Sequence, residues 1–137
     1  MEFTDIAMEL SKEAWQASFQ HPFVLQLQEG TLEPSIFRYY LIQDAYYLKS
    51  FSEAYHLLAD KTSNQEMKRL LKQNAQSLVE GELFIRQQFF KELGISDQEM
   101  DEQPIAPTCY HYISHIYRQF AEPNLGIAFA SLLPCPW

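Results

Sequence analysis

The sequence is poor in basic residues and in long apolar segments. Ten lysines and arginines stand against 18 aspartates and glutamates, and the formal net charge is −8 at pH 7. Such a chain repels phosphate backbones, and only Lys68, Arg69 and Lys72 form a small basic group, so no nucleic-acid partner is expected. No apolar run approaches the length of a membrane span, so no membrane partner is expected either.

Cysteine is also scarce, with only Cys109 and Cys135 present. Two cysteines are too few for a disulfide framework, and they lack the C-x-x-C spacing of a zinc or redox motif. They indicate a reducing compartment and at most one reactive thiol. Glu2, Asp5 and Glu9 stand where a signal peptide would carry positive charge, so we expect a cytoplasmic protein.

The remaining composition predicts one all-α domain over residues 1–137. The length suits a single compact domain, and no Gly/Ser-rich linker divides it. Apolar residues recur at helical spacing, and no stretch alternates with period two. The clearest helix is expected from Pro34 to about Asp60, and a second long helix from the Ser63/Glu66 capping box to Gly94. Shorter helices are expected over 3–19 (capped by Thr4 or Asp5), 21–30, 96–103 (from a Ser96/Glu99 capping box), 107–120 and 123–133.

Asp44 is the first polar residue placed where the core should be. At about 100° per residue it falls inside the apolar stripe of the Pro34 helix. A carboxylate there is costly unless it is paired or hydrogen-bonded. Either Asp44 bonds a tyrosine hydroxyl or a helix N-terminus for structural reasons, or it lines a pocket and reads a polar ring.

Glu82 occupies the corresponding inward position on the second long helix. Two inward carboxylates can bind a metal ion, but dimetal helical bundles use Glu-x-x-His pairs, and this helix has no histidine. We therefore expect no metal. The neighbouring Gly81 is unfavourable in a helix interior, which suggests the close approach of a neighbouring helix or a ligand.

Cys135 lies between Pro134 and Pro136. Proline cannot donate to the helical hydrogen-bond ladder, so the backbone there is kinked, which can direct the thiol into a cavity. Most buried cysteines are inert small apolar residues, and that alternative stays open.

Five short runs, in order along the whole chain, carry a resemblance. They are "HPF" (21–23), "YYLIQDAYYL" (39–48), "EGE" (80–82), "TCYHYISHIY" (108–117) and "LLPC" (132–135). Together they resemble the TenA family of thiaminase II or aminopyrimidine aminohydrolase enzymes. The resemblance implies a helical bundle of the haem-oxygenase-like type without haem, no cofactor, and a homotetramer. It also implies hydrolysis of 4-amino-5-aminomethyl-2-methylpyrimidine, or of thiamin, in thiamin salvage.

The resemblance also implies roles for individual residues. Cys135 would be the nucleophile that adds to the pyrimidine ring, and Asp44 would hold a ring nitrogen. Tyr47 would stack on the ring, Tyr112 would support the reacting groups, and Glu82 would assist in substrate binding.

The resemblance covers all of this sequence but only somewhat over half of a typical member. In the family, later helices supply another pocket tyrosine and an acid/base glutamate. We therefore expect the N-terminal portion of a longer TenA-like domain, apparently without the C-terminal helices. The alternative is a catalytically incomplete helical module that binds a pyrimidine or a protein partner.

Overall fold

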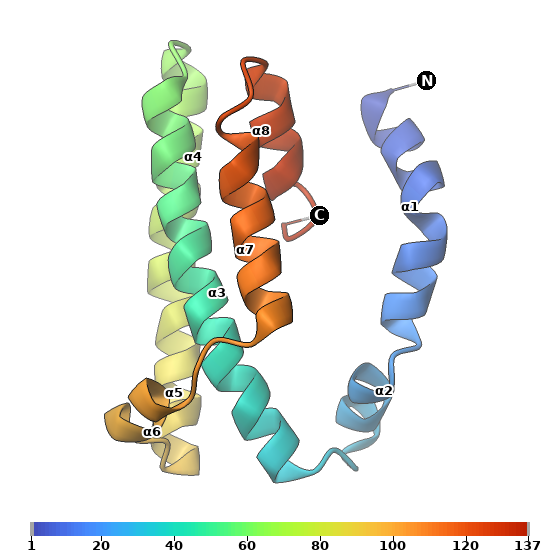
Figure 1. Cartoon of the computed structure of the whole chain (residues 1–137), viewed down its shortest axis with the longest axis vertical. Helices are drawn as coiled ribbons and strands as arrows, with labels where there is room; N and C mark the ends of the chain where they lie inside the picture. The colour runs from blue at the N-terminus through green and yellow to red at the C-terminus, as the bar shows by residue number, and fades with distance from the viewer. Residues whose placement is uncertain (1, 137) are drawn as a thin grey trace. The chain divides into compact units, whose positions relative to one another are not determined.

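The computed structural model describes residues 2–136, and every regular element among them is helical (Figure 1). The all-α prediction is confirmed. The elements are α1 (Phe3–Phe19), α2 (Pro22–Glu29), α3 (Pro34–Lys61), α4 (Gln65–Ser77), the π-helix η1 (Leu78–Leu83), α5 (Phe84–Leu93), α6 (Asp97–Glu102), α7 (Pro107–Gln119) and α8 (Leu125–Leu132). No helix within the described residues is both long enough and apolar enough to span a membrane.

The chain divides into two compact units, Met1–Phe37 and Arg38–Trp137, with the boundary inside α3. Met1 and Trp137, the two ends of the predicted single domain, lie outside the described residues, and that domain assignment stays a prediction.

In the first unit, local sequence sets both helices. The residue before α1 is Glu2, whose backbone N–H donates to Asp5 Oδ2 at 3.0 Å. Asp5 therefore helps to cap the start of this helix, as predicted, but it does so from the first turn as part of a capping box, and the N-cap residue itself is Glu2 and not Thr4. Helix α2 ends at Gly30 in the left-handed conformation (φ 71°), as its position predicts.

The second unit has a core that α3 shares with α4, α7 and α8. The buried cluster consists of Phe51, Ala54, Tyr55, Leu58 and Ala59 from α3, Leu71 and Ala75 from α4, Ile116 and Phe120 from α7 and its end, and Ala128 and Leu132 from α8. Helix α3 contributes five of these residues, more than any other helix, so the packing of the core fixes the position of α3 and of the polar residues on its other turns. Figure 1 shows α3 beside α4 and α7.

Buried polar side chains of α3 also fix where α7 begins. The side chain of Gln43 donates to the Pro104 carbonyl at 3.0 Å and accepts from the Ala106 N–H at 2.7 Å. Tyr46 donates its hydroxyl to the Met100 carbonyl at 2.8 Å. These bonds satisfy backbone groups of the link between α6 and α7, so α7 has a defined position beside α3.

Arg38 joins the end of α5 to α6. Its guanidinium donates to the Leu93 carbonyl at 2.5 Å and to the Gly94 carbonyl at 3.1 Å, and it forms an ion pair with Glu99. Ser96 caps α6 by accepting from the Glu99 N–H at 3.1 Å, which confirms the N-terminal half of that predicted capping box.

The second long helix is continuous to Gly94, as predicted, but it is not a regular α-helix throughout. It begins one residue later than expected, because the Asn64 side chain accepts from the Met67 N–H at 3.0 Å and acts as the cap. Leu78–Leu83 forms a π-helix between α4 and α5. Its i→i+5 hydrogen bonds take more residues per turn, so the later residues lag by about one position.

This lag changes which side chains of α5 face inward. An ideal α-helix would bury Ile85, yet Ile85 is 46% exposed. The side chain of Arg86, one residue later, is only 17% exposed. A Cβ added at Gly81 would meet nothing within 4 Å, so the expected close approach of a neighbouring helix is wrong within the described part of the chain.

Candidate functional site

A pocket of about 450 Å³ opens between α3, the α4–η1–α5 helix and the turn that follows α8. Its lining residues are Asp44, Tyr47, Leu48, Phe51, Tyr55, Asn74, Ser77, Leu78, Glu82, Arg86, Cys135 and Pro136. The volume suits a small ring compound, and the lining combines aromatic faces with a few polar groups, as in most ligand sites. Four of the five predicted site residues line it.

Asp44 is largely buried, with its side chain 13% exposed. Its Oδ2 atom pairs with Arg86 Nε, and its Oδ1 atom accepts from the Tyr40 hydroxyl at the long distance of 3.4 Å. Burial raises the pKa of Asp44, and the adjacent Arg86 only partly opposes this effect. Both interpretations of Asp44 therefore describe part of the geometry: it bonds a tyrosine hydroxyl, and it lines a pocket.

Glu82 is placed less deeply than the helical pattern predicts. Its side chain is 51% exposed, and its Oε2 atom lies 3.8 Å from Arg86 Nη2. The fully inward orientation expected for Glu82 is wrong, because the π-helix rotates this part of the chain relative to an ideal α-helix. Glu82 nevertheless lines the pocket, as a partly solvated carboxylate.

Tyr47 is held by aromatic contacts, and within residues 2–136 no group meets its hydroxyl at hydrogen-bonding geometry, although the Cys135 thiol and the Tyr112 hydroxyl lie near it. Its ring stacks on Phe51 at 5.3 Å and on Tyr112 at 5.5 Å between centroids. A ligand ring would have to share the Tyr47 face with these rings or displace one of them. The hydroxyl is buried and makes no hydrogen bond within residues 2–136. Burial, followed by the nearby Cys135 thiol and Tyr112, raises the pKa of Tyr47 far above its usual range.

Tyr112 is the one predicted site residue that does not line the pocket. It is half-buried on α7 and supports the site through its stacked contact with Tyr47. Burial raises the pKa of Tyr112, and the neighbouring Tyr47 hydroxyl partly opposes the change.

Cys135 lies in the turn after α8 and lines the pocket next to Pro136. The residue is exposed, but the protein around its thiol still displaces water, and this raises the pKa of Cys135. Tyr47 opposes the shift, while the charges of Asp44 and Glu82 add to it. The pocket thus holds the thiol mainly in its protonated form at neutral pH, and a nucleophilic role requires a proton acceptor.

Cys109 is the natural comparison for Cys135. It is half-buried on α7, outside the pocket lining, and its thiol donates to the Gln43 carbonyl at 3.6 Å. Burial, and then the charge of Asp44, raise the pKa of Cys109. A bonded and less exposed thiol suits the structural role of most buried cysteines.

Arg86 is the pocket residue that the sequence analysis missed. An α-helical projection places it off the inward stripe, and the π-helix that brings it inward has no recognisable sequence pattern. One signal was available, because Glu82 and Arg86 are four residues apart, the spacing of a helical ion pair.

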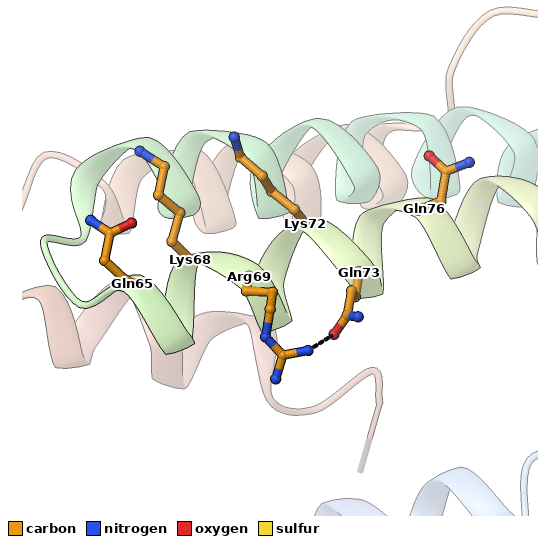
Figure 2. A pocket seen from close by; sticks show the side chains of 6 residues that line it. All are labelled: Gln65, Lys68, Arg69, Lys72, Gln73 and Gln76. Atoms are coloured by element: carbon orange, nitrogen blue, oxygen red, sulfur yellow. Dashed lines mark hydrogen bonds between the residues drawn. The ribbon is translucent and has the colours of Figure 1, made fainter.

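A second hollow, of about 480 Å³, follows the surface of α4. It is lined by Gln65, Lys68, Arg69, Lys72, Gln73 and Gln76 (Figure 2). Within it Arg69 donates to the Gln73 side chain at 3.0 Å. All of these side chains come from one helix, and most are exposed, so we assign no site to this basic surface. Among residues 2–136, no three His, Cys, Asp or Glu side chains are grouped to hold a metal ion.

Known proteins are similar to this chain in both sequence and fold. The TENA/THI-4/PQQC family profile matches residues 10–137. An aminopyrimidine aminohydrolase of Bacillus subtilis (strain 168) is 34% identical over 137 residues, which is the whole of this chain and 58% of that protein. An aminopyrimidine aminohydrolase of Halalkalibacterium halodurans is 27% identical, also over the whole chain and over 61% of its own length.

Two solved structures are similar in fold. The TenA homologue protein from P. horikoshii OT3 has a TM-score of 0.89 at 27% identity, covering 100% of this chain and 64% of its own. A TenA family transcription regulator from Silicibacter sp. has a TM-score of 0.89 at 25% identity, covering 98% of this chain and 60% of its own. The chain thus spans about 58 to 64% of the length of these relatives. Because the family profile covers nearly the whole sequence, the chain belongs to the TENA/THI-4/PQQC family.

Proposed function

We propose that this chain carries the nucleophile and the ring-binding groups of an aminopyrimidine aminohydrolase that acts in thiamin salvage. The observation that carries the proposal is the pocket in which Cys135 meets Asp44 and Tyr47 of α3, about 90 residues earlier in the sequence. The names of the two bacterial relatives support the same substrate class.

Each pocket group has a role in the proposed reaction. The Asp44 carboxylate accepts a hydrogen bond from a protonated ring nitrogen of the pyrimidine, and the protonated ring accepts electrons more readily. The Cys135 thiol gives up its proton as its sulfur adds to a ring carbon, and the electrons displaced by this addition neutralise the ring. The electrons that this addition places in the ring expel the amine from the exocyclic methylene group as ammonia. Water adds to the methylene group, and loss of the sulfur restores the aromatic ring.

Because the pKa of Cys135 is raised, its thiol is mainly protonated at neutral pH, and the proposed mechanism needs a proton acceptor. The thiol proton has to leave before or during addition, and the pocket groups that act on the thiol are the Tyr47 hydroxyl and the carboxylates of Asp44 and Glu82. Among the two carboxylates, Glu82 is the more solvated and lacks a short ion pair, so it is the better placed to exchange protons with water. We assign it this supporting role. Tyr112 acts by keeping the Tyr47 ring in place.

Three related assignments stay predictions of the sequence: a cytoplasmic location, assembly as a homotetramer, and action without a cofactor. The choice between thiamin and the aminopyrimidine as substrate belongs to the same proposal. The net charge of −8 favours a small-molecule partner over a nucleic acid.

The test is hydrolysis of 4-amino-5-aminomethyl-2-methylpyrimidine by the 137-residue chain, with the product identified by mass. Cys135→Ser is the active-site control, and Cys109→Ser is the matched control outside the pocket. The proposal expects product that depends on Cys135 and not on Cys109. Binding of the pyrimidine without any product would favour the alternative, a non-catalytic pyrimidine-binding module. Absence of both product and binding would refute the proposal for this chain.

A further inference from the structure

The two oxygens of the Asp44 carboxylate are held very differently. Oδ2 makes a short ion pair with Arg86 Nε, in which both side chains are mostly buried. Among the described residues, the hydrogen bond to Oδ1 is the one from the Tyr40 hydroxyl, at 3.4 Å, which is near the limit for a hydrogen bond. A ligand N–H group can therefore compete for Oδ1 at little cost, whereas Oδ2 is occupied.

The position of Arg86 depends on the π-helix before it. The extra residue of η1 places Arg86 against Asp44, and the Nη2 atom of the same guanidinium lies 3.8 Å from Glu82 Oε2. Arg86 thus contacts two acidic side chains of the same pocket, and it bonds the deeper of the two. A purely structural ion pair would not require the arginine to line the same pocket as the candidate nucleophile.

We infer that Arg86 is the positioning residue for Asp44: it holds Oδ2, keeps the carboxylate ionised, and leaves Oδ1 to accept an N–H group of the bound aminopyrimidine. This inference rests on the proposed function for its ligand. It adds a residue that acts through Asp44 and does not itself touch the reacting atoms.

The surroundings of Asp44 determine the direction of the effect. The titratable or charged groups that face it are Tyr40 from α3, Glu82 from η1, Arg86 from α5, Cys109 from α7 and Cys135 from the turn after α8. Burial raises the pKa of Asp44, and Arg86 is the largest influence that lowers it. Removing the guanidinium should therefore raise this pKa further and leave Asp44 protonated over a wider pH range.

The experiment compares Arg86→Gln, which removes the charge, with Arg86→Lys, which retains it. Arg69→Gln is the matched control, because Arg69 is exposed on α4, outside the pocket lining, and donates to the Gln73 side chain at 3.0 Å. The pKa of Asp44 is measured by carbon NMR of aspartate-labelled protein, with Asp44→Asn identifying its signal. Affinity for 4-amino-5-aminomethyl-2-methylpyrimidine is measured by calorimetry from pH 5 to pH 9.

We expect Arg86→Gln to raise the pKa of Asp44 and to weaken binding about ten-fold near pH 6, with the loss shrinking as pH rises and Asp44 ionises. Arg86→Lys should keep the pKa of Asp44 and the affinity for the pyrimidine close to those of the unaltered chain. Arg69→Gln should change neither quantity. An unchanged Asp44 pKa in folded Arg86→Gln would overturn the inference, as would a binding loss that is equal at every pH. If the unaltered chain does not bind the pyrimidine, the proposed function fails together with the ligand part of the inference, while the NMR titration still decides whether Arg86 controls Asp44.

Discussion

Replacing Tyr47 with phenylalanine should stabilise the protein and weaken ligand binding at the same time. The Tyr47 hydroxyl is buried without a hydrogen bond in the described part of the chain, while its ring stacks on Phe51 and Tyr112. Phenylalanine keeps the ring and removes the unpaired hydroxyl. A group that is unfavourable in the free protein and positioned in a pocket is expected to find its partner in a ligand.

The size of each effect follows from the surroundings of the Tyr47 hydroxyl, first in the free protein and then in the complex with the ligand. A buried hydroxyl without a bond costs about 1 to 3 kcal/mol in proteins, so Tyr47→Phe should raise the free energy of unfolding by up to about 1 to 2 kcal/mol. A single neutral hydrogen bond to a ligand contributes about 0.5 to 1.5 kcal/mol, so affinity should fall by roughly three- to ten-fold.

Urea denaturation and calorimetric titration of the aminopyrimidine measure both effects. Tyr117→Phe is the matched control, because the Tyr117 hydroxyl donates to the Ser50 carbonyl at 3.0 Å and lies outside the pocket lining. That variant should lose about 0.5 to 1.5 kcal/mol of stability and keep its affinity. If Tyr47→Phe lost stability as Tyr117→Phe does, with unchanged binding, the reasoning would be refuted.

Three further predictions concern the pocket and the π-helix. Asp44→Asn should weaken binding of the aminopyrimidine about ten-fold or more in calorimetry, because a charge-assisted bond is lost; unchanged affinity would remove Asp44 from the site. Gly81→Ala should raise the free energy of unfolding by about 0.5 to 1 kcal/mol in urea, because its φ is not positive and a Cβ meets no neighbour; a loss of stability would show a contact that the structure lacks. Alkylation of Cys135 by iodoacetamide should accelerate with pH, because the thiolate is the reactive form. The protein raises the pKa of this thiol above its ordinary value of 9.0, so the rate should reach half its maximum above pH 9.0. A midpoint near pH 7 would contradict the surroundings described for Cys135.

The long α3 helix was the most predictable part of the molecule. Its apolar stripe and Pro34 set its course, and the structure ends it at Lys61, one residue after the predicted Asp60. Asp44 could be picked out for the same reason, because a carboxylate inside a regular helical stripe is visible in sequence. The left-handed glycines at positions 30 and 94 were equally readable as helix ends.

The α4–η1–α5 helix shows what sequence could not provide. A π-helix depends on how a helix packs along its length, and no residue pattern in "LVEGEL" marks it. Every position after it is rotated relative to the α-helical projection. Glu82, inside the π-helix, is consequently more exposed than an α-helical projection predicts. Beyond it, Ile85 is exposed where the projection buries it, and Arg86 faces inward where the projection does not.

Cys135 and Tyr112 depend on contacts between distant segments. The two prolines indicated a kink beside Cys135, but only the fold shows that its thiol lines the same pocket as Asp44. The role of Tyr112 came from the family resemblance, and its actual contact is the stacked ring of Tyr47. The catalytic roles of Cys135, Asp44 and Tyr112 and the substrate-binding roles of Tyr47 and Glu82 stay predictions.

The measurement that tests the central claim most directly is protection of Cys135 by the aminopyrimidine. The chain is treated with iodoacetamide at pH 8 with and without 4-amino-5-aminomethyl-2-methylpyrimidine, and each cysteine is followed by mass spectrometry. Cys109 is the internal control because it lies outside the pocket lining. The account predicts slower modification of Cys135 when the pyrimidine is bound, with no change at Cys109. Equal modification of Cys135 with and without saturating pyrimidine would contradict it.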